Sequence, residues 1–568
     1  MIIFRKFNDI FFQLLFLIST FVTFIISELY FYTPNGVDHI YHSKYLSYFL
    51  YQSEDTYSGF GLIYYYIVAL ITHLRIQEVN NLNVVHFMNS SIITANFILF
   101  LFGILGIYYL LRKYGFGKKT IYISLTLNNF IIPVLIMRSI LKPEIFAFTL
   151  LPWVILGLDN YIEKKNFKSF LVVVLPLSVL LTIKGSVTGM IILILLIKYY
   201  KFLFLDFKKH LLSLLILAFA FGLLSYETSN VNNYNILEHN FTGVGSKYDN
   251  KAELNLLTNI NLWDIIFNPE PPYHNDSLVG ITLLDSFGDY FNVFIEYEEH
   301  LFIYDQDNNF INELNYKNKF QFGKYVGQYT GFLMSLFFYV SCIYFAVRKK
   351  DISAYYIAPL IGILILTISS FGFPFNHFDP NTGDTLKSNY YSFLISISFI
   401  FVLVQIFKKY HFLKLFIPLY ILFSFFYILG FPKVDDSNIN KYLEEKIEIS
   451  LACEPMSIFL SDTDFEDCHD RVKKICEYNL YSNNAQNLID KSRVYLSINE
   501  QESILFVNDD GQILSANNYS TCKQYVQMEL VTYNPVSKGL RQLPPVNMIY
   551  FLYTFLYIFY ITYKERTN

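Results

Sequence analysis

Long apolar stretches recur along most of this chain, and they restrict its fold more than any other feature. Each runs for about 17 to 22 residues, long enough for a helix to cross the roughly 30 Å of hydrocarbon in a bilayer. Only 16% of the residues are charged, whereas a soluble protein carries about a quarter. The first stretch, 10–26, is too long and aromatic for a cleaved signal peptide and is interpreted as a retained span. The sequence therefore predicts an all-α polytopic membrane protein.

The pattern predicts about 12 transmembrane helices, or 13 if the tyrosine-rich segment 59–74 also crosses. The predicted crossings are 10–29, 91–111, 120–137, 145–162, 169–183, 186–200, 211–226, 327–347, 354–372, 390–407, 413–430 and 547–563. Basic residues are concentrated in alternate short connections, such as 112–119 and 348–350. By the positive-inside rule these connections are cytoplasmic, and both termini are then cytoplasmic too.

The segment 59–74 is interpreted as an interfacial or re-entrant helix, because a full crossing there would reverse the side of every later loop. Its three consecutive tyrosines, Tyr64, Tyr65 and Tyr66, are predicted to lie at the level of the lipid headgroups.

Three large pieces fall on the extracytoplasmic side: residues 30–90, 227–326 and 431–546. The first two are loops of a transmembrane domain spanning 1–430. The third is predicted to be a small C-terminal α/β domain, followed at 547–568 by a final transmembrane helix and cytoplasmic tail. It contains Cys453, Cys468, Cys476 and Cys522. Four cysteines outside the cytoplasm favour disulfide bonds, and a metal site is the alternative, although the paired spacing of zinc ligands is missing.

The outward loop after the first span contains an acid and two histidines, Asp38, His39 and His42. A carboxylate at the water boundary of a membrane bundle is a candidate general base. We therefore predict that Asp38 is catalytic, and that His39 and His42 bind substrate.

Four cations lie at or just beyond the outer ends of predicted spans: Arg138, Lys142, Lys184 and Lys387. A cation inside the bilayer costs roughly 2.5–3.5 kcal/mol at mid-depth and less near the interface. Snorkelling to the headgroups would explain any one of them. Because all four cations lie on the same side of the membrane as Asp38, we predict that they bind one shared anion, such as a lipid phosphate or pyrophosphate.

Two further positions on this side carry candidate site residues. Glu144 follows Pro143 at the start of a span, where an acid is favourable, so it is either a helix cap or a second catalytic acid. The loop 375–384 contains His377, and Tyr390 follows at the next span. His377 and Tyr390 are candidate substrate ligands. The alternative for the loop is that its polar residues only contact water. The stretch 281–292, with acids among aromatics, suggests either a sugar site or a folded outer helix.

Several functions are disfavoured by what the sequence lacks. It has no P-loop and no GxGxxG after a strand, so nucleotide and redox cofactors are not indicated. No basic stripe suggests nucleic acid. The sequence requires no cofactor and predicts no metal centre, although a divalent cation bound through Asp38 with Glu144 or His377 is left open.

Taken together, these motifs resemble the GT-C superfamily of polytopic membrane glycosyltransferases, particularly the protein O-mannosyltransferase and aminoarabinose transferase types. Pro34 and Asp38 match the acid-bearing first outer loop, and 61–66 is similar to the interfacial stretch that follows it. The segment 138–144 resembles the outward Pro-Glu position, and 387–391 resembles the late Lys-Tyr signature. The likeness covers 1–430; the paired acids common in the first loop are replaced here by Asp38-His39.

The resemblance implies an extracytoplasmic enzyme of cell-envelope glycan synthesis in the cell (inner) membrane. It would move a hexose or pentose from a polyprenyl-phosphate carrier to a glycan, lipid or protein hydroxyl, with Asp38 as base. Three alternatives remain. One is a flippase or exporter of lipid-linked saccharides, and another is an O-antigen polymerase or ligase, which typically has more outer-loop arginines. The third is a non-catalytic assembly protein.

Overall fold

A computed structural model of the 568-residue chain was analysed. It describes residues 2–30, 39–50, 61–76, 84–164, 166–205, 207–231, 255–260, 262–267, 277–288, 290, 300–304, 310–315, 321–371, 386–409, 492–497, 503–508, 513–518 and 540–567. The four cysteines of the predicted C-terminal domain and the predicted crossing at 413–430 lie outside these residues.

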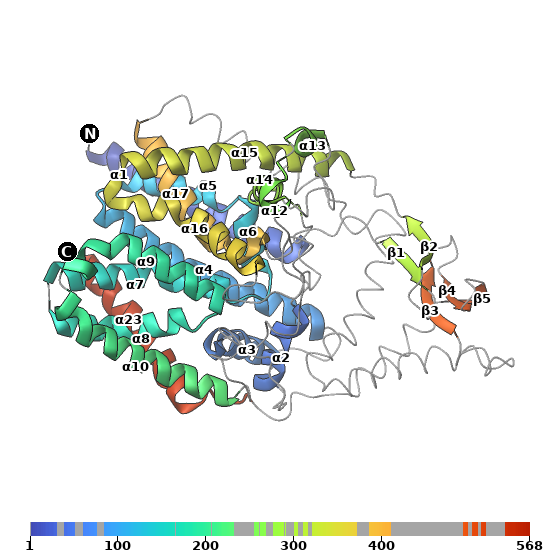
Figure 1. Cartoon of the computed structure of the whole chain (residues 1–568), viewed down its shortest axis with the longest axis horizontal. Helices are drawn as coiled ribbons and strands as arrows, with labels where there is room; N and C mark the ends of the chain where they lie inside the picture. Colours follow the sequence, from blue (N-terminus) through green and yellow to red (C-terminus); the bar gives the residue numbers. More distant parts are fainter. Residues whose placement is uncertain are drawn as a thin grey trace.

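The described part of the chain is mostly helical (Figure 1). Its earlier helices are α1 (Ile2–Tyr30), α2 (His39–Leu50), α3 (Leu62–Ile76), α4 (Val84–Lys113), α5 (Lys118–Asn128), α6 (Ile132–Ser139), α7 (Glu144–Lys164), α8 (Phe167–Leu181), α9 (Gly185–Leu205) and α10 (Phe207–Val231). The later ones are α12 (Asn255–Thr258), α13 (Leu262–Phe267), α14 (Leu278–Asp285), α15 (Gln321–Arg348), η2 (Lys350–Ile352), α16 (Ser353–Ser370), η5 (Ser388–Tyr390), α17 (Ser392–Lys409) and α23 (Pro545–Thr567).

Two short antiparallel sheets are also present. Strand β1 (His300–Tyr304) pairs with β2 (Phe310–Asn315), within the predicted loop 227–326. In the predicted C-terminal domain, β3 (Ser492–Ser497), β4 (Ser503–Asn508) and β5 (Ile513–Asn518) form one sheet in the order β3-β4-β5.

Nine helices among the described residues are long and apolar enough to cross a membrane, or ten if the bent pair α5 and α6 forms one span. These helices identify a polytopic membrane protein. Each coincides with a predicted crossing. The predicted crossing 169–183 corresponds to the shorter apolar helix α8. The start of α1 and the end of α23 lie at the same end of the bundle (Figure 1).

Helices α7 and α17 form the centre of this bundle. The apolar window of α7 is 89% buried and that of α17 is 83% buried, whereas that of α10 is only 28% buried. Helix α7 packs against α4 and α8, and α10 presents leucines such as Leu212 and Leu215 outward. Elements placed at the two ends of α7 are therefore held by the most buried of the described candidate spans.

The predicted continuous span 120–137 is instead broken in the middle. Helix α5 ends at Asn128, α6 begins at Ile132, and the two axes differ by 69°. Asn129 donates from its side-chain amide to the hydroxyls of Ser19 (2.9 Å) and Thr20 (2.8 Å) on α1. Asn128 bonds in the same way to Ser396 of α17. Asparagine is a poor helix former, and the break turns α6 towards η5 and α17, which it contacts.

The tyrosine run of α3 is buried between helices. Helix α3 packs on α2 and α4, and Tyr64, Tyr65 and Tyr66 are all buried inside the protein. Tyr45 of α2 stacks on Tyr65 at 4.3 Å. The aromatic faces of this run make contacts between helices, and its level relative to the lipid headgroups stays a prediction.

The late helix α23 is joined to the bundle by a carboxylate cap. Glu227, near the end of α10, accepts hydrogen bonds from the backbone N–H groups of Val546 (2.9 Å) and Asn547 (2.6 Å). These donors belong to the first turn of α23, where no intrahelical acceptor exists.

Farther along α23, the Tyr557 hydroxyl donates to the carbonyl of Trp153 at 2.7 Å, beside Gly157. A Cβ at Gly157 would lie 2.1 Å from that hydroxyl, so only glycine fits.

We expect Glu227→Gln to lower the free energy of unfolding by about 1–3 kcal/mol, because one of the two oxygens that accept these N–H groups is replaced and the charge is lost. Thermal or denaturant unfolding of the detergent-solubilised protein measures this change. Glu163→Gln is the control: Glu163 pairs with Lys113 at 2.7 Å, but its side chain is 58% exposed, so its loss should cost under about 1 kcal/mol. Equal effects of the two substitutions would contradict the role of Glu227 as a cap.

Candidate functional site

Most of the predicted site residues that the structure describes come together around the start of α7. Arg138 lies in the last turn of α6, Glu144 begins α7, and Lys184 immediately precedes α9. Lys142 lies between α6 and α7, and Tyr390 ends η5. Asp38 and His377 lie outside the described residues, as does the side chain of His39, whose backbone begins α2.

The local sequence explains how α6 and α7 present their ends to each other. Ile140 has an extended backbone (φ −90°, ψ 149°) and stops α6. Pro143 directly precedes Glu144, and proline is suited to a helix start because its missing N–H would have no partner there. The carboxylate of Glu144 thereby stands at the positive end of the helix dipole of α7.

Glu144 forms an ion pair with Lys184. The distance between Glu144 Oε1 and Lys184 Nζ is 3.0 Å, and the two side chains are only 2% and 14% exposed. The other carboxylate oxygen, Oε2, is buried without a hydrogen-bond partner among the described residues. The pair therefore leaves one acceptor of Glu144 available inside the protein.

The cations Lys142 and Lys184 share an aromatic ring. Each Nζ lies 4.3 Å from the centre of the Tyr390 ring. Cations are attracted to aromatic faces at such distances. Residues separated by more than 200 positions in the sequence are thus gathered at one point.

Arg138 is the least compensated charge of this cluster. It is 1% exposed, and within the described part of the structure none of its three guanidinium nitrogens has a hydrogen-bond partner. Its guanidinium lies 5.0 Å from the ring of Phe100. Arginine stays protonated in proteins, and a buried charge without a partner is strongly unfavourable. The geometry therefore suits an anion brought by a ligand.

The segment η5 is fixed by Asp285 of α14. Asp285 Oδ2 accepts a hydrogen bond from the backbone N–H of Ser388 at 2.6 Å, and Ser286 contacts the Tyr391 hydroxyl at 3.3 Å. Burial, with a further contribution from Asp285, raises the pKa of Tyr391 to about 12, so its phenol remains neutral. Asp285 belongs to the acid-and-aromatic stretch 281–292 noted in the sequence, and here it anchors the element that carries Tyr390. Lys387 is buried at the start of the same segment.

A polar path joins this cluster to α2, the helix that begins directly after Asp38. His42 is fully buried and hydrogen-bonds the Tyr65 hydroxyl. The neighbouring Tyr64 donates to Asn96 at 3.0 Å, and Asn96 donates to the carbonyl of Ile140 at 2.8 Å. Asn96 was missed from the sequence; its one signal was a polar residue inside a predicted span.

A small cavity, with mostly apolar lining, lies beside the cluster. Its lining includes Leu62 and Tyr64 of α3, Phe146 of α7, and Ile183 directly before Lys184. Phe146 is two residues from Glu144, so apolar and charged walls adjoin. No group of three or more His, Cys, Asp or Glu side chains suited to a metal occurs among the residues that the structure describes.

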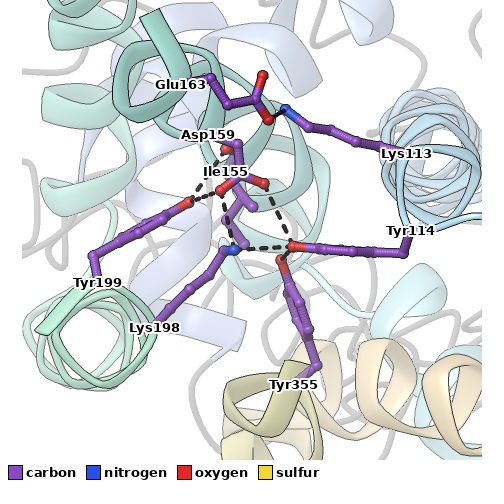
Figure 2. A network of polar contacts seen from close by, with 8 residues as sticks. All are labelled: Lys113, Tyr114, Ile155, Asp159, Glu163, Lys198, Tyr199 and Tyr355. Atoms are coloured by element: carbon purple, nitrogen blue, oxygen red, sulfur yellow. Dashed lines mark hydrogen bonds and ion pairs between the residues drawn. The ribbon is translucent and has the colours of Figure 1, made fainter. Parts of the chain in front are cut away.

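A second charged cluster occupies the opposite end of α7 (Figure 2). Asp159 pairs with Lys198 at 3.0 Å and accepts hydrogen bonds from Tyr199 (2.8 Å) and Tyr114 (3.4 Å). Burial and the nearby Asp159 raise the pKa of Tyr114, which therefore stays protonated. The Tyr355 hydroxyl joins at 3.0 Å from that of Tyr114. Because this carboxylate is fully engaged by protein groups, the cluster is interpreted as a connection between α4, α7, α9 and α16.

Comparison of the chain with protein-family models, with curated proteins and with solved structures found no match.

Proposed function

We propose that this protein is a membrane glycosyltransferase that moves a sugar from a polyprenyl-phosphate carrier to a glycan, lipid or protein hydroxyl on the extracytoplasmic face. The observation that carries the proposal is the buried Arg138, whose guanidinium has no hydrogen-bond partner among the described residues. A buried cation is strongly unfavourable unless an anion compensates it. The phosphate of the carrier would be that anion.

The reaction would be a direct displacement that inverts the anomeric carbon. Asp38 would accept the proton of the acceptor hydroxyl, and the bond from the sugar to the carrier phosphate would break. Arg138 would stabilise the negative charge that grows on the leaving phosphate. The remaining substrate ligands of the proposal are His39, His42, Lys142, Glu144, Lys184, His377, Lys387 and Tyr390.

Two features of the described residues support these roles. The polar path from His42 to Ile140 connects the helix after Asp38 with the segment that carries Lys142. The cations Lys142 and Lys184, gathered at the ring of Tyr390, would attract a phosphate group. A divalent cation, held by Asp38 with Glu144 or His377, is compatible with the proposal but not required by it.

The finer architecture belongs to the same proposal. It comprises a GT-C-like catalytic domain of about 12 or 13 spans at 1–430 and an extracytoplasmic, disulfide-bonded α/β domain at 431–546. A final span and a cytoplasmic tail follow at 547–568. The protein would lie in the cell (inner) membrane with its active site outside, opposite the basic loops.

The proposal is tested by offering the purified full-length protein radiolabelled sugars on polyprenyl phosphate and, separately, the same sugars on nucleotides. Envelope glycolipid extract serves as the acceptor. We expect label to move from the lipid-linked donors only. Transfer from a nucleotide sugar would contradict the donor class. Absence of transfer from every lipid-linked donor, together with passage of these lipids across a reconstituted bilayer, would replace the enzyme by a flippase.

A further inference from the structure

Tyr390 lies between two lysines that come from different parts of the chain. Lys142 precedes α7 and Lys184 precedes α9, and both ammonium groups are 4.3 Å from the centre of its ring. The two Nζ atoms can therefore be no farther apart than the sum of these two distances. Two like charges at that separation repel each other, and this repulsion is strong where water is largely excluded.

Three contacts offset this repulsion without any ligand. The aromatic ring attracts both ammonium groups, and Glu144 neutralises one of them through its 3.0 Å bond to Lys184. Lys142 is 5% exposed, and its backbone N–H donates to the carbonyl of Ile140 at 3.0 Å. The lysines are thus held in place before an anion arrives, which lowers the entropy cost of binding.

The ring itself is held by its backbone. The N–H of Tyr390 donates to the carbonyl of Lys387 at 3.2 Å, and the N–H of Ser388, two residues before Tyr390, donates to Asp285 Oδ2 at 2.6 Å. Tyr390 is nevertheless partly exposed, unlike the buried residues 386–389 that precede it. The backbone of Tyr390 is thus fixed, and its side chain is partly exposed beside two lysines that are 5% and 14% exposed.

We infer that Tyr390 is a positioning residue that makes Lys142 and Lys184 one binding unit for a phosphate group. This inference rests on the proposed function for the identity of the donor, but the anion site itself does not require sugar transfer. The ring of Tyr390, rather than its hydroxyl, would carry the role, because cation–π attraction depends on the aromatic face.

The test is equilibrium binding to the purified full-length protein in lipid nanodiscs, with sugar-free polyprenyl monophosphate and inorganic phosphate as separate probes. Two variants are compared. Tyr390→Leu removes the ring, and we expect it to weaken binding about tenfold, within the range of cation–π energies. Tyr390→Phe keeps the ring and should stay within about twofold of wild type. Tyr200→Leu is the matched control, because Tyr200 is an exposed tyrosine with a lysine, Lys201, at 5.8 Å.

Each outcome decides a separate point. Equal losses in Tyr390→Leu and Tyr390→Phe, or wild-type binding by Tyr390→Leu, would overturn the role of the ring. Failure of the wild type to bind either probe would overturn the site. Binding of the lipid probe alone would identify a lipid phosphate as the ligand, and binding of both probes would identify the phosphate group itself. If the wild type binds phosphate with the expected variant order but transfers no sugar, the proposed function fails and this inference stands.

Discussion

Arg138→Met is expected to lower the rate of sugar transfer by about 100- to 1,000-fold, the usual loss when one donor to a developing negative charge is removed. The same substitution should leave the free energy of unfolding unchanged or raise it by about 1 kcal/mol or more. Arg138 is buried without a hydrogen-bond partner among the described residues, and replacing a poorly compensated buried charge by an apolar side chain of similar length is often stabilising. Steady-state transfer kinetics and thermal unfolding measure the two effects.

Arg75→Met is the matched control for this prediction. Arg75 on α3 donates to the Thr94 hydroxyl at 2.9 Å, so its removal loses a partner and should lower stability slightly while transfer continues. A large loss of stability in Arg138→Met, parallel to its loss of activity, would show that Arg138 supports the fold instead of a substrate. A lower transfer rate together with an unchanged or higher free energy of unfolding would indicate that Arg138 serves ligand binding at a cost in stability.

Asp38→Asn is expected to reduce transfer by about 100-fold or more, because asparagine keeps the size and polarity of the side chain but cannot accept a proton. Binding of the sugar-free polyprenyl phosphate should change little, since the proposed role of Asp38 concerns the acceptor. Transfer kinetics with saturating donor, beside the equilibrium binding of that lipid, separate the two effects.

Asp351→Asn controls for the charge change. Asp351 is an exposed acid in η2, between α15 and α16, and its loss should leave transfer at the wild-type rate. If Asp38→Asn transfers sugar at the wild-type rate, Asp38 is not the base. Glu144 then becomes the next candidate. Either conclusion requires that the variant unfolds at the same midpoint as the wild type.

The sequence predicted the helices of this protein better than its site. Hydropathy identifies a span because about 20 apolar residues suffice to cross a bilayer, and the nine long helices all coincide with predicted crossings. The break after Asn128 escaped prediction, since hydropathy averages over the polar residues that cause it. Its cause is tertiary: the side chains of Asn128 and Asn129 bond to residues of α17 and α1.

The candidate site residues were chosen from the sequence by residue type and predicted topology, which gave no information about their partners. Topology grouped Arg138, Lys142, Lys184 and Lys387 without distances. Only packing brings Lys184 to Glu144 and both lysines to Tyr390, because those contacts depend on how α7, α9 and η5 meet. No periodicity in the sequence distinguishes Arg138, whose guanidinium has no hydrogen-bond partner among the described residues, from Lys184, which pairs with Glu144.

The position of α23 in the chain has a consequence for biosynthesis. This helix emerges from the ribosome after every element that it contacts, among them α3, α7, α8 and α10, and domains form from the N-terminus onward during synthesis. Until it inserts, Gly157 lacks its contact with Tyr557, and Glu227 lacks the N–H groups that it caps. A nascent chain that terminates before α23 therefore leaves the carboxylate of Glu227 without these hydrogen-bond donors.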